Sequence, residues 1–283
     1  MTDPLTAHDV VSRLLPEKLD PARFFEAYAP SNIALSKYWG KRNKPLNLPL
    51  NSSLSVSLAD LGSQTQVMPA SDEQDRVWLN GDLLAPDSPF ARKVVDFANL
   101  FRRGQPQPLH IKTTNTISTA AGLASSASGF AALTKALVGS FGLELPDAQQ
   151  SMIARLGSGS ATRSFWHGFV RWDRGDLDDG SDSFARPLNH PWPEFRIAII
   201  PVDTGPKAHS SRDGMQHTVS TSPLYAPWPE RAEADCFEIE QAVAAQDFVR
   251  CNPTAGQCWT GCGPLGGRVC LPTQPWMPAQ ISS

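Results

Sequence analysis

The first 235 residues of this 283-residue chain contain no cysteine, and all five cysteines lie between Cys236 and Cys270. Most of the chain therefore needs no disulfide to fold. The late cysteines lack the paired Cys-x-x-Cys elements of a zinc site, and no histidine follows His217. A structural zinc ion is therefore disfavoured.

Long apolar runs and an excess of positive charge are also missing. No stretch reaches the ~18 apolar residues that a membrane-spanning helix needs, and the N-terminal residues lack the basic start and apolar run of a secretory signal. The net charge is −3, whereas nucleic-acid-binding proteins usually carry a basic surplus. We therefore expect a cytoplasmic protein that binds neither membranes nor nucleic acid.

Residues 248–283 contain no Asp, Glu, Lys or His, and Cys, Gly and Pro fill 14 of these 36 positions. The preceding residues 230–247 are typical of an acidic amphipathic helix. A folded domain seldom loses its charges so abruptly. We therefore expect that the reading frame or the gene end changed near Arg250, and that residues 251–283 form a tail foreign to the fold.

The rest of the chain has the patterns of a folded α+β protein, after a polar arm of about 25 residues. The Asn80-Gly81 pair is typical of a hairpin turn. The patterns predict strands at 53–58, 64–67, 76–79, 109–113, 165–172 and 195–202, and helices at 90–103, 130–142, 146–156 and 230–247. A Pro- and Asp-rich stretch at 173–194 predicts a boundary near residue 194. It separates an N-terminal domain (1–194) from a partial C-terminal domain (195–250).

A segment rich in Gly, Ala and Ser, TAAGLASSASG at residues 119–129, lies between a predicted strand and a predicted helix. Small residues let the backbone approach a polyphosphate, and a helix N-terminus offers N–H groups and a favourable dipole. The hydroxyls of Ser125 and Ser126 could add donors or help to hold a magnesium ion. A tight strand-to-helix turn with serine caps is the alternative.

Two further segments have the residue types of an anion site. Lys37, Lys41 and Arg42 place three cations within six residues, which suits either an anionic substrate or a solvated basic loop. Residues 157–164, GSGSATRS, combine small hydroxyl residues with Arg163. An arginine can grip a carboxylate with two parallel hydrogen bonds; a flexible linker is the alternative.

Together these segments resemble the diphosphomevalonate decarboxylase family of the galactokinase–homoserine kinase–mevalonate kinase superfamily. The resemblance runs from Ala29 to about Arg250 and is carried by NIALSKYWGKR, LNLPLNSSLSVSL, TAAGLASSASGFAAL, GSGSATRS and SSRDGMQHTVSTSPLY. It implies a two-domain α+β small-molecule kinase fold. The N-terminal domain (1–194) would be ribosomal-protein-S5-like and would be the ATP- and substrate-binding domain. The C-terminal domain would be ferredoxin-like and incomplete, with a homodimer as the usual assembly.

The resemblance also implies a reaction of the mevalonate pathway of isoprenoid biosynthesis. ATP and Mg²⁺ would serve to convert 5-diphosphomevalonate into isopentenyl diphosphate, ADP, phosphate and CO2. By resemblance, Arg163 and Lys37 are the catalytic candidates, and Arg163 also holds the substrate carboxylate. The other substrate-binding candidates are Asn32, Tyr38, Lys41, Ser158, Ser160, Ser210 and Ser211. The nucleotide-binding candidates are Gly122, Leu123, Ala124, Ser125 and Ser126, and the two serines are also the metal-binding candidates.

One departure from the family matters for activity. The family carries a general-base Asp in a late motif of the type DAGPN, and residues 248–283 contain no carboxylate. Asp203 and Asp213 are the candidates that could replace this Asp as the general base, but neither matches that motif. A positioned base contributes about 10²–10⁴ in rate, and the late segment of the family would also supply packing for the second domain. We therefore expect this chain to be poorly stable and weakly active or inactive.

Two alternatives stay open. The chain is similar enough to related enzymes to be a mevalonate 3-kinase, or a decarboxylase of mono- or bisphosphorylated mevalonate; a kinase alone would release no CO2. A truncated pseudoenzyme that only binds ligand is the non-catalytic alternative, and the missing Asp favours it.

Overall fold

The computed structural model describes residues 5–71, 73–104, 107–116, 125–198 and 211–251. The helices are α1 (Ala7–Leu14), α2 (Pro89–Asn99), α3 (Ser125–Ser140), α4 (Asp147–Gly157), α5 (Ser211–Thr221) and α6 (Trp228–Ala244), with a 3-10 helix η2 (Gly159–Arg163). The strands are β1 (Phe25–Ser36), β2 (Lys41–Asn43), β3 (Leu48–Pro49), β4 (Ser53–Pro69), β5 (Arg76–Leu79), β6 (Asp82–Leu83), β7 (Leu109–Asn115), β8 (Phe169–Trp172) and β9 (Ala185–Pro187).

Strand β4 organises the sheet because it is long enough to pair with three other strands. Its first residues pair with β8, its last seven pair with β7, and β1 runs antiparallel along its other edge. Within the described ranges, seven strands form this sheet in the order β6-β5-β7-β4-β8-β9, with β1 on β4. Only β5 and β7 pair in parallel among these strands. The fold is α+β, as expected.

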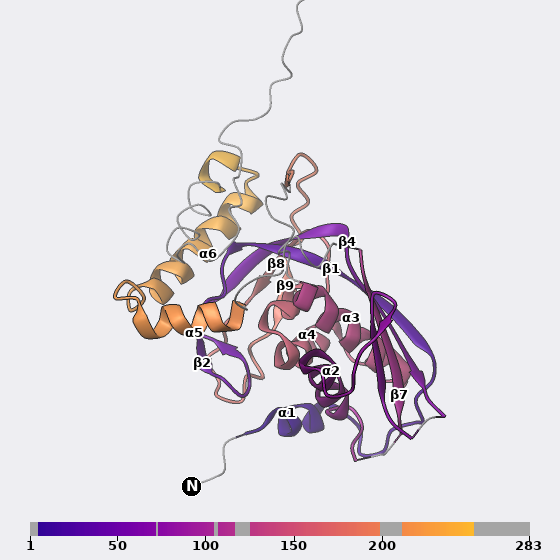
Figure 1. Cartoon of the computed structure of the whole chain (residues 1–283). Helices are drawn as coiled ribbons and strands as arrows, with labels where there is room; N and C mark the ends of the chain where they lie inside the picture. The colour runs from indigo at the N-terminus through magenta and orange to yellow at the C-terminus, as the bar shows by residue number, and fades with distance from the viewer. Residues whose placement is uncertain (1–4, 72, 105–106, 117–124, 199–210, 252–283) are drawn as a thin grey trace, which may run out of the picture.

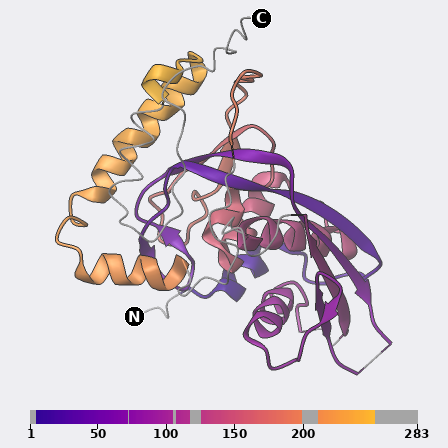
Figure 2. The same ribbon diagram turned by 45° about the horizontal axis from the view of Figure 1, so that its top comes forward.

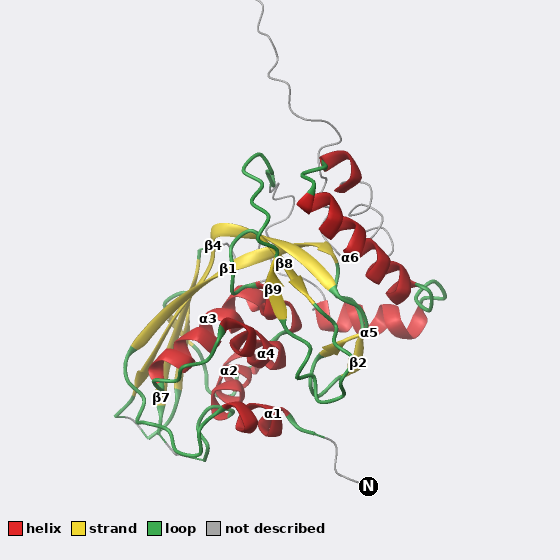
Figure 3. Ribbon diagram, turned by 180° about the vertical axis from the view of Figure 1, so that it is seen from behind, coloured by secondary structure: helices red, strands yellow, loops and turns green. Residues whose placement is uncertain are grey.

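The helices cover two different parts of this sheet. The main core lies between the sheet and α2, α3 and α4, and it contains Phe97, Phe130 and Leu137. A second cluster places Ile33 and Leu54 against Ile239 of α6. Figures 1 and 3 show α3 and α4 beneath the arch of β1 and β4, and α6 outside that arch. The middle of β1 is therefore buried on both faces.

The expected helices at 90–103, 130–142, 146–156 and 230–247 are confirmed as α2, α3, α4 and α6, with ends that differ by a few residues. The hairpin turn is also confirmed: Asn80 and Gly81 have φ of 52° and 94° between β5 and β6. The strands expected at 53–58 and 64–67 are parts of the single strand β4. Left-handed backbone at Ala59 (φ 49°) lies in the middle of β4, between the parts that pair with β8 and with β7.

Three expectations differ from the structure in part or in whole. The polar arm contains helix α1, which begins with a capping box between Thr6 and Asp9. Only Phe169–Trp172 of the expected strand 165–172 is a strand. Residues 195–198 are not a strand: the Phe195 N–H donates to Trp192 O at 3.0 Å in a local turn, and the Phe195 ring packs on Phe169 and Trp192. Residues 199–202 lie outside the described residues.

Helix α6 is joined to the sheet by ion pairs as well as by apolar contacts. Arg171 on β8 pairs with Glu240 at 2.6 Å and with Glu233 at 3.4 Å. Cys251 is buried in the α6 cluster, so the packing continues to the start of the expected foreign tail; residues 252–283 lie outside the described residues. The division at residue 194 stays a prediction. No described helix is long and apolar enough to cross a membrane.

Candidate functional site

A buried arginine marks the centre of the site. Arg163 is the last residue of η2, and only 3% of its surface is exposed. Its Nη1 donates to Ser53 Oγ at 2.6 Å, and its guanidinium lies 5.9 Å from the centre of the Trp172 ring. Burial lowers the pKa of Arg163 to about 10. None of the ion pairs between described residues includes Arg163, although a buried cation without a counter-charge is costly.

Tyr38 lies next to this arginine. Its ring packs on Trp172 with centroids 4.8 Å apart, and burial raises its pKa more than Arg212 and Arg163 lower it. Among the described residues, no hydrogen-bond partner meets Tyr38 Oη or Arg163 Nε, and both atoms are buried. Buried polar atoms are usually paired. The two atoms are therefore suited to a bound ligand with oxygen acceptors.

The GSGSATRS segment forms a compact wall of the site and not a flexible linker. Asn32 Nδ2 donates to Ser160 O at 3.2 Å and to Ser164 Oγ at 2.8 Å, while Ser158 and Ser160 bring their hydroxyls within 3.4 Å. A Cβ at Gly159 would lie 2.7 Å from Tyr38 Cε1. The small residues thus let η2 approach Tyr38 closely. The structure brings Asn32, Tyr38, Ser158, Ser160 and Arg163 together.

Three cations from different parts of the chain repel one another beside this wall. Burial, together with repulsion from Arg212 and Lys93, lowers the pKa of Lys41 to about 8. Burial and repulsion from Arg212 also lower the pKa of Lys93 to about 8. Lys41 Nζ donates to Asn47 Oδ1. Repulsion among clustered cations makes this region favourable for a polyanion.

Lys93 and Arg212 were missed by sequence reasoning. Arg212 follows the two serines of the SSRDGM stretch, so the motif itself was a signal. Lys93 lies on α2 outside every recognised stretch, and its ammonium reaches the site by lying 4.5 Å above the Phe130 ring of α3. No local pattern indicates that approach.

Other predicted residues are placed less completely. Lys37 Nζ lies 5.6 Å from the centre of the Trp39 ring, and Lys37 O accepts from Asn51 Nδ2 at 2.8 Å. Ser125 is the first residue of α3 and Ser211 the first of α5, while Ser126 is exposed. Asp213 is exposed in the first turn of α5. Gly122, Leu123, Ala124, Asp203 and Ser210 lie outside the described residues.

A metal ion would need ligands beyond a carboxylate cluster. Over the described ranges, no group of three or more His, Cys, Asp or Glu side chains could hold one. Serine hydroxyls and the phosphate oxygens of a nucleotide are hard oxygen donors, which suit Mg²⁺. The donor chemistry of Ser125 and Ser126 is thus compatible with a metal brought in with its nucleotide.

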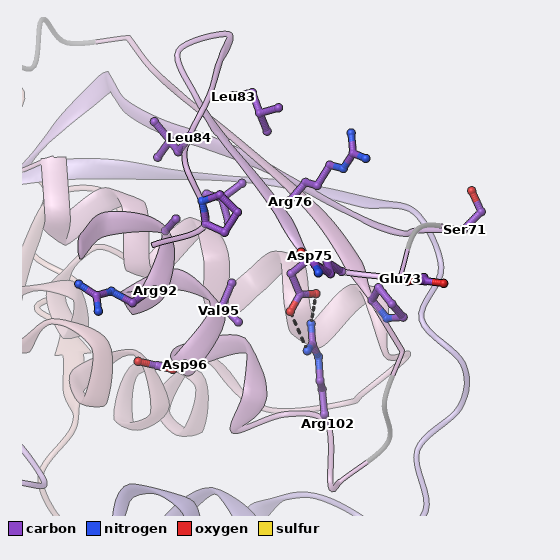
Figure 4. A pocket seen from close by; sticks show the side chains of 15 residues that line it. Ser71, Glu73, Asp75, Arg76, Leu83, Leu84, Arg92, Val95, Asp96 and Arg102 are labelled. Carbon is purple, nitrogen blue, oxygen red and sulfur yellow. Dashed lines mark hydrogen bonds and ion pairs between the residues drawn. The ribbon is translucent and has the colours of Figure 1, made fainter. Parts of the chain in front are cut away.

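A separate hollow lies between α2 and the β5–β6 hairpin, and Figure 4 shows its lining. Asp75 is one of the lining residues. It pairs with Arg102 at 2.6 Å and accepts a hydrogen bond from Leu109 N at 2.7 Å. None of the predicted site residues lines this hollow. The Asp75–Arg102 pair fastens the loop before β5 to the end of α2, so we assign these contacts a structural role.

Comparison with known proteins identifies the family of this site. A family model described as "Diphosphomevalonate decarboxylase-like N-terminal domain" matches residues 29–185, which include Arg163, Tyr38 and Lys41. The chain belongs to the diphosphomevalonate decarboxylase family.

Relatives of this family agree with the match. The diphosphomevalonate decarboxylase of Candida albicans is 44% identical over 241 residues, which cover 78% of this chain and 65% of that protein. The chain therefore spans less than two thirds of the length of that relative. The mevalonate diphosphate decarboxylase of Staphylococcus aureus has a similar structure, with a TM-score of 0.77, 34% identity, and coverage of 85% of this chain and 73% of that one. A structure of MDDEF in complex with MVAPP, AMPPCP and magnesium gives a TM-score of 0.74 at 37% identity, covering 85% and 74% of the two chains.

Proposed function

We propose that this family member binds 5-diphosphomevalonate and, with ATP, converts it into isopentenyl diphosphate, ADP, phosphate and CO2. The observation that supports this most is a pair of buried donors, Arg163 Nε and Tyr38 Oη, that find no partner among the described residues and lie beside the Lys41–Lys93–Arg212 cluster. A mevalonate diphosphate presents a carboxylate at one end and a diphosphate at the other. One charged end suits the buried arginine, and the other suits the cation cluster.

In this proposal Arg163 holds the carboxylate and keeps it near the reacting carbon. Ser53 fixes one nitrogen of its guanidinium, and Trp172 limits the space beneath it, so the orientation of the remaining donors is set before substrate binds. Ser158 and Ser160 line the same wall. Tyr38 donates its hydroxyl, since a phenol is protonated at neutral pH and burial raises the pKa of Tyr38 further. Lys41 and Arg212 balance the diphosphate charge.

ATP, when bound with Mg²⁺, supplies the phosphoryl group that turns the tertiary hydroxyl of the substrate into a leaving group. The start of α3 offers N–H groups to its phosphates, with Ser125 and Ser126 as the candidate metal ligands. Lys93 adds a cation near this end, since its ammonium lies over Phe130 of the same helix. Fixed cations stabilise the negative charge that shifts during phosphoryl transfer.

The proton of the tertiary hydroxyl needs an acceptor. The described residues do not include the DAGPN-type motif that carries the general-base Asp in the family. Asp213 is exposed at the start of α5, and the late segment 248–283 carries no carboxylate. We therefore propose that a chain of these 283 residues binds substrate but turns it over slowly. The same proposal includes a domain division at residue 194, a ferredoxin-like second domain, a homodimer and a cytoplasmic location. It also includes the roles given to Lys37, Ser210 and Ser211.

The test combines binding with turnover. Calorimetric titration of the purified 283-residue chain with 5-diphosphomevalonate should give binding, and Arg163→Lys should weaken it. CO2 and ADP release should then be measured with ATP and Mg²⁺ beside the Candida albicans relative. ADP without CO2 would favour the 3-kinase alternative, a rate equal to that of the relative would refute slow turnover, and absence of binding by the unmodified chain would overturn the proposal.

A further inference from the structure

Tyr225 joins the turn after α5 to the substrate-binding segment. Its hydroxyl donates to Trp39 O at 2.9 Å, across 186 positions of sequence. Its own ring stacks on Trp228 of α6 with centroids 6.0 Å apart and planes inclined by 20°. Because Tyr225 is held by α6, the hydrogen bond ties Trp39 to a helix and not to a free loop.

Gly40 is the residue that makes this contact possible. It has φ of +108°, where an L side chain is strained, and a Cβ there would lie 1.7 Å from Tyr225 Oη. Gly40 O also accepts from Leu50 N at 3.2 Å. The backbone at Trp39 and Gly40 is therefore shaped to receive the tyrosine hydroxyl.

This contact lies between two residues of the candidate site. Tyr38 precedes Trp39 and Lys41 follows Gly40, so the backbone that Tyr225 holds carries a ligand candidate on each side. Tyr225 also follows α5, whose second residue is Arg212. The same tyrosine thus connects the loop of Tyr38 and Lys41 with the helix that carries Arg212, and repulsion from Arg212 lowers the pKa of Lys41.

We propose that Tyr225 is a positioning residue that fixes the Trp39–Gly40 backbone, so that Tyr38, Lys41 and Arg212 meet the diphosphate end of the substrate together. The inference rests on the proposed function. Tyr225 itself does not touch the reacting atoms; it acts by removing conformational freedom that substrate binding would otherwise have to restrict.

The test replaces Tyr225 by Phe, which keeps the ring and its stacking on Trp228 and removes only the hydroxyl. Tyr28→Phe is the matched control, because Tyr28 Oη donates to Ala59 O at 2.8 Å and also lies over a glycine, Gly62. Two quantities are measured on the full chain: the affinity for 5-diphosphomevalonate by calorimetry, and amide hydrogen exchange of the peptide covering residues 37–42.

We expect Tyr225→Phe to weaken binding by about three- to ten-fold, the effect of one lost hydrogen bond, and to speed exchange in residues 37–42. Tyr28→Phe should change neither quantity. Unchanged affinity in Tyr225→Phe would overturn the positioning role, with or without faster exchange, and so would an equal loss in Tyr28→Phe. If the unmodified chain does not bind the substrate, the proposed function fails, and that result is distinct from binding that is insensitive to Tyr225.

Discussion

Arg163 Nη1 and Ser53 Oγ are 2.6 Å apart, and this hydrogen bond joins the end of η2 to the first residue of β4. The neighbouring Ser52 is held from the other side, because its N–H donates to Glu233 Oε2 of α6 at 2.6 Å. Arg163 is therefore held by Ser53, and the backbone next to Ser53 is in turn held by α6. Such support keeps a binding group in one geometry before its ligand arrives.

Arg163→Lys should weaken the binding of 5-diphosphomevalonate by about 10- to 100-fold, because lysine keeps the charge but loses the planar donor fork. Calorimetry measures the affinity, and thermal unfolding shows whether the variant is folded. Arg174→Lys is the control, since Arg174 forms an exposed ion pair with Asp176 at 2.9 Å. Equal affinities for the two variants would contradict the assignment of Arg163.

Binding should also weaken as pH rises from 7 to 9. Burial together with neighbouring cations lowers the pKa of Lys41 and of Lys93 to about 8. Both ammonium groups therefore lose their protons across this range in the free protein, whereas a bound anion favours the protonated forms. Titrations in buffers of different ionisation enthalpy should detect proton uptake on binding near pH 8. An affinity independent of pH over this range would refute the role of both lysines.

The site was partly predictable from sequence because its small-residue segments are local. GSGSATRS and the segment around Tyr38 contain the residues that the structure brings together. Lys93 could not be found in this way, because it reaches the site only after α2 packs on α3. The exposed position of Ser126, in contrast, follows from a helix start that no pattern could place relative to the sheet.

Helices and strands with one buried face were predictable from sequence. Elements that are buried on two faces were harder to predict. Helices α2 and α4 have apolar positions at helical spacing and were predicted. The middle of β1 is covered on one side by α3 and on the other by α6, so it lacks the alternation of polar and apolar residues that indicates a strand. Proline is uncommon inside a strand, and Pro30 lies opposite Gly62 next to a register shift.

Gly157→Ala should destabilise the protein by about 1–3 kcal/mol, the cost of overpacking a filled site. A Cβ at Gly157 would lie 2.1 Å from Phe130 Cδ1. Gly129→Ala is the contrasting variant: it lies within α3, and its nearest atom, Ser63 Oγ, would be 4.0 Å from the new Cβ. We expect it to stabilise by about 0.5–1 kcal/mol. Urea unfolding measures both, and stabilisation of the Gly157 variant would show that the contact with Phe130 is loose.

Glu240→Gln should weaken the attachment of α6 to the sheet more than Glu238→Gln on the same helix does. Glu240 accepts from Arg171 at 2.6 Å and from Arg186 at 2.9 Å, and its side chain is 17% exposed. Glu238 pairs with Arg250, and both side chains are close to half exposed. Removing the charge of Glu240 leaves Arg171 with less compensation in a partly buried network. An exposed pair is worth at most about 1 kcal/mol.

We expect Glu240→Gln to lower the free energy of unfolding by about 1–2 kcal/mol, and Glu238→Gln to lower it by no more than about 0.5 kcal/mol. Urea unfolding followed by circular dichroism gives both values, and hydrogen exchange in residues 228–244 should be faster only in the Glu240 variant. Because exposed charges are screened by salt more than buried ones, the Glu240 effect should persist in 1 M NaCl. If the two variants lose the same stability, the Glu240 ion pairs do not hold α6 on the sheet, and the contacts of Glu233 and of the apolar cluster around Ile239 are sufficient.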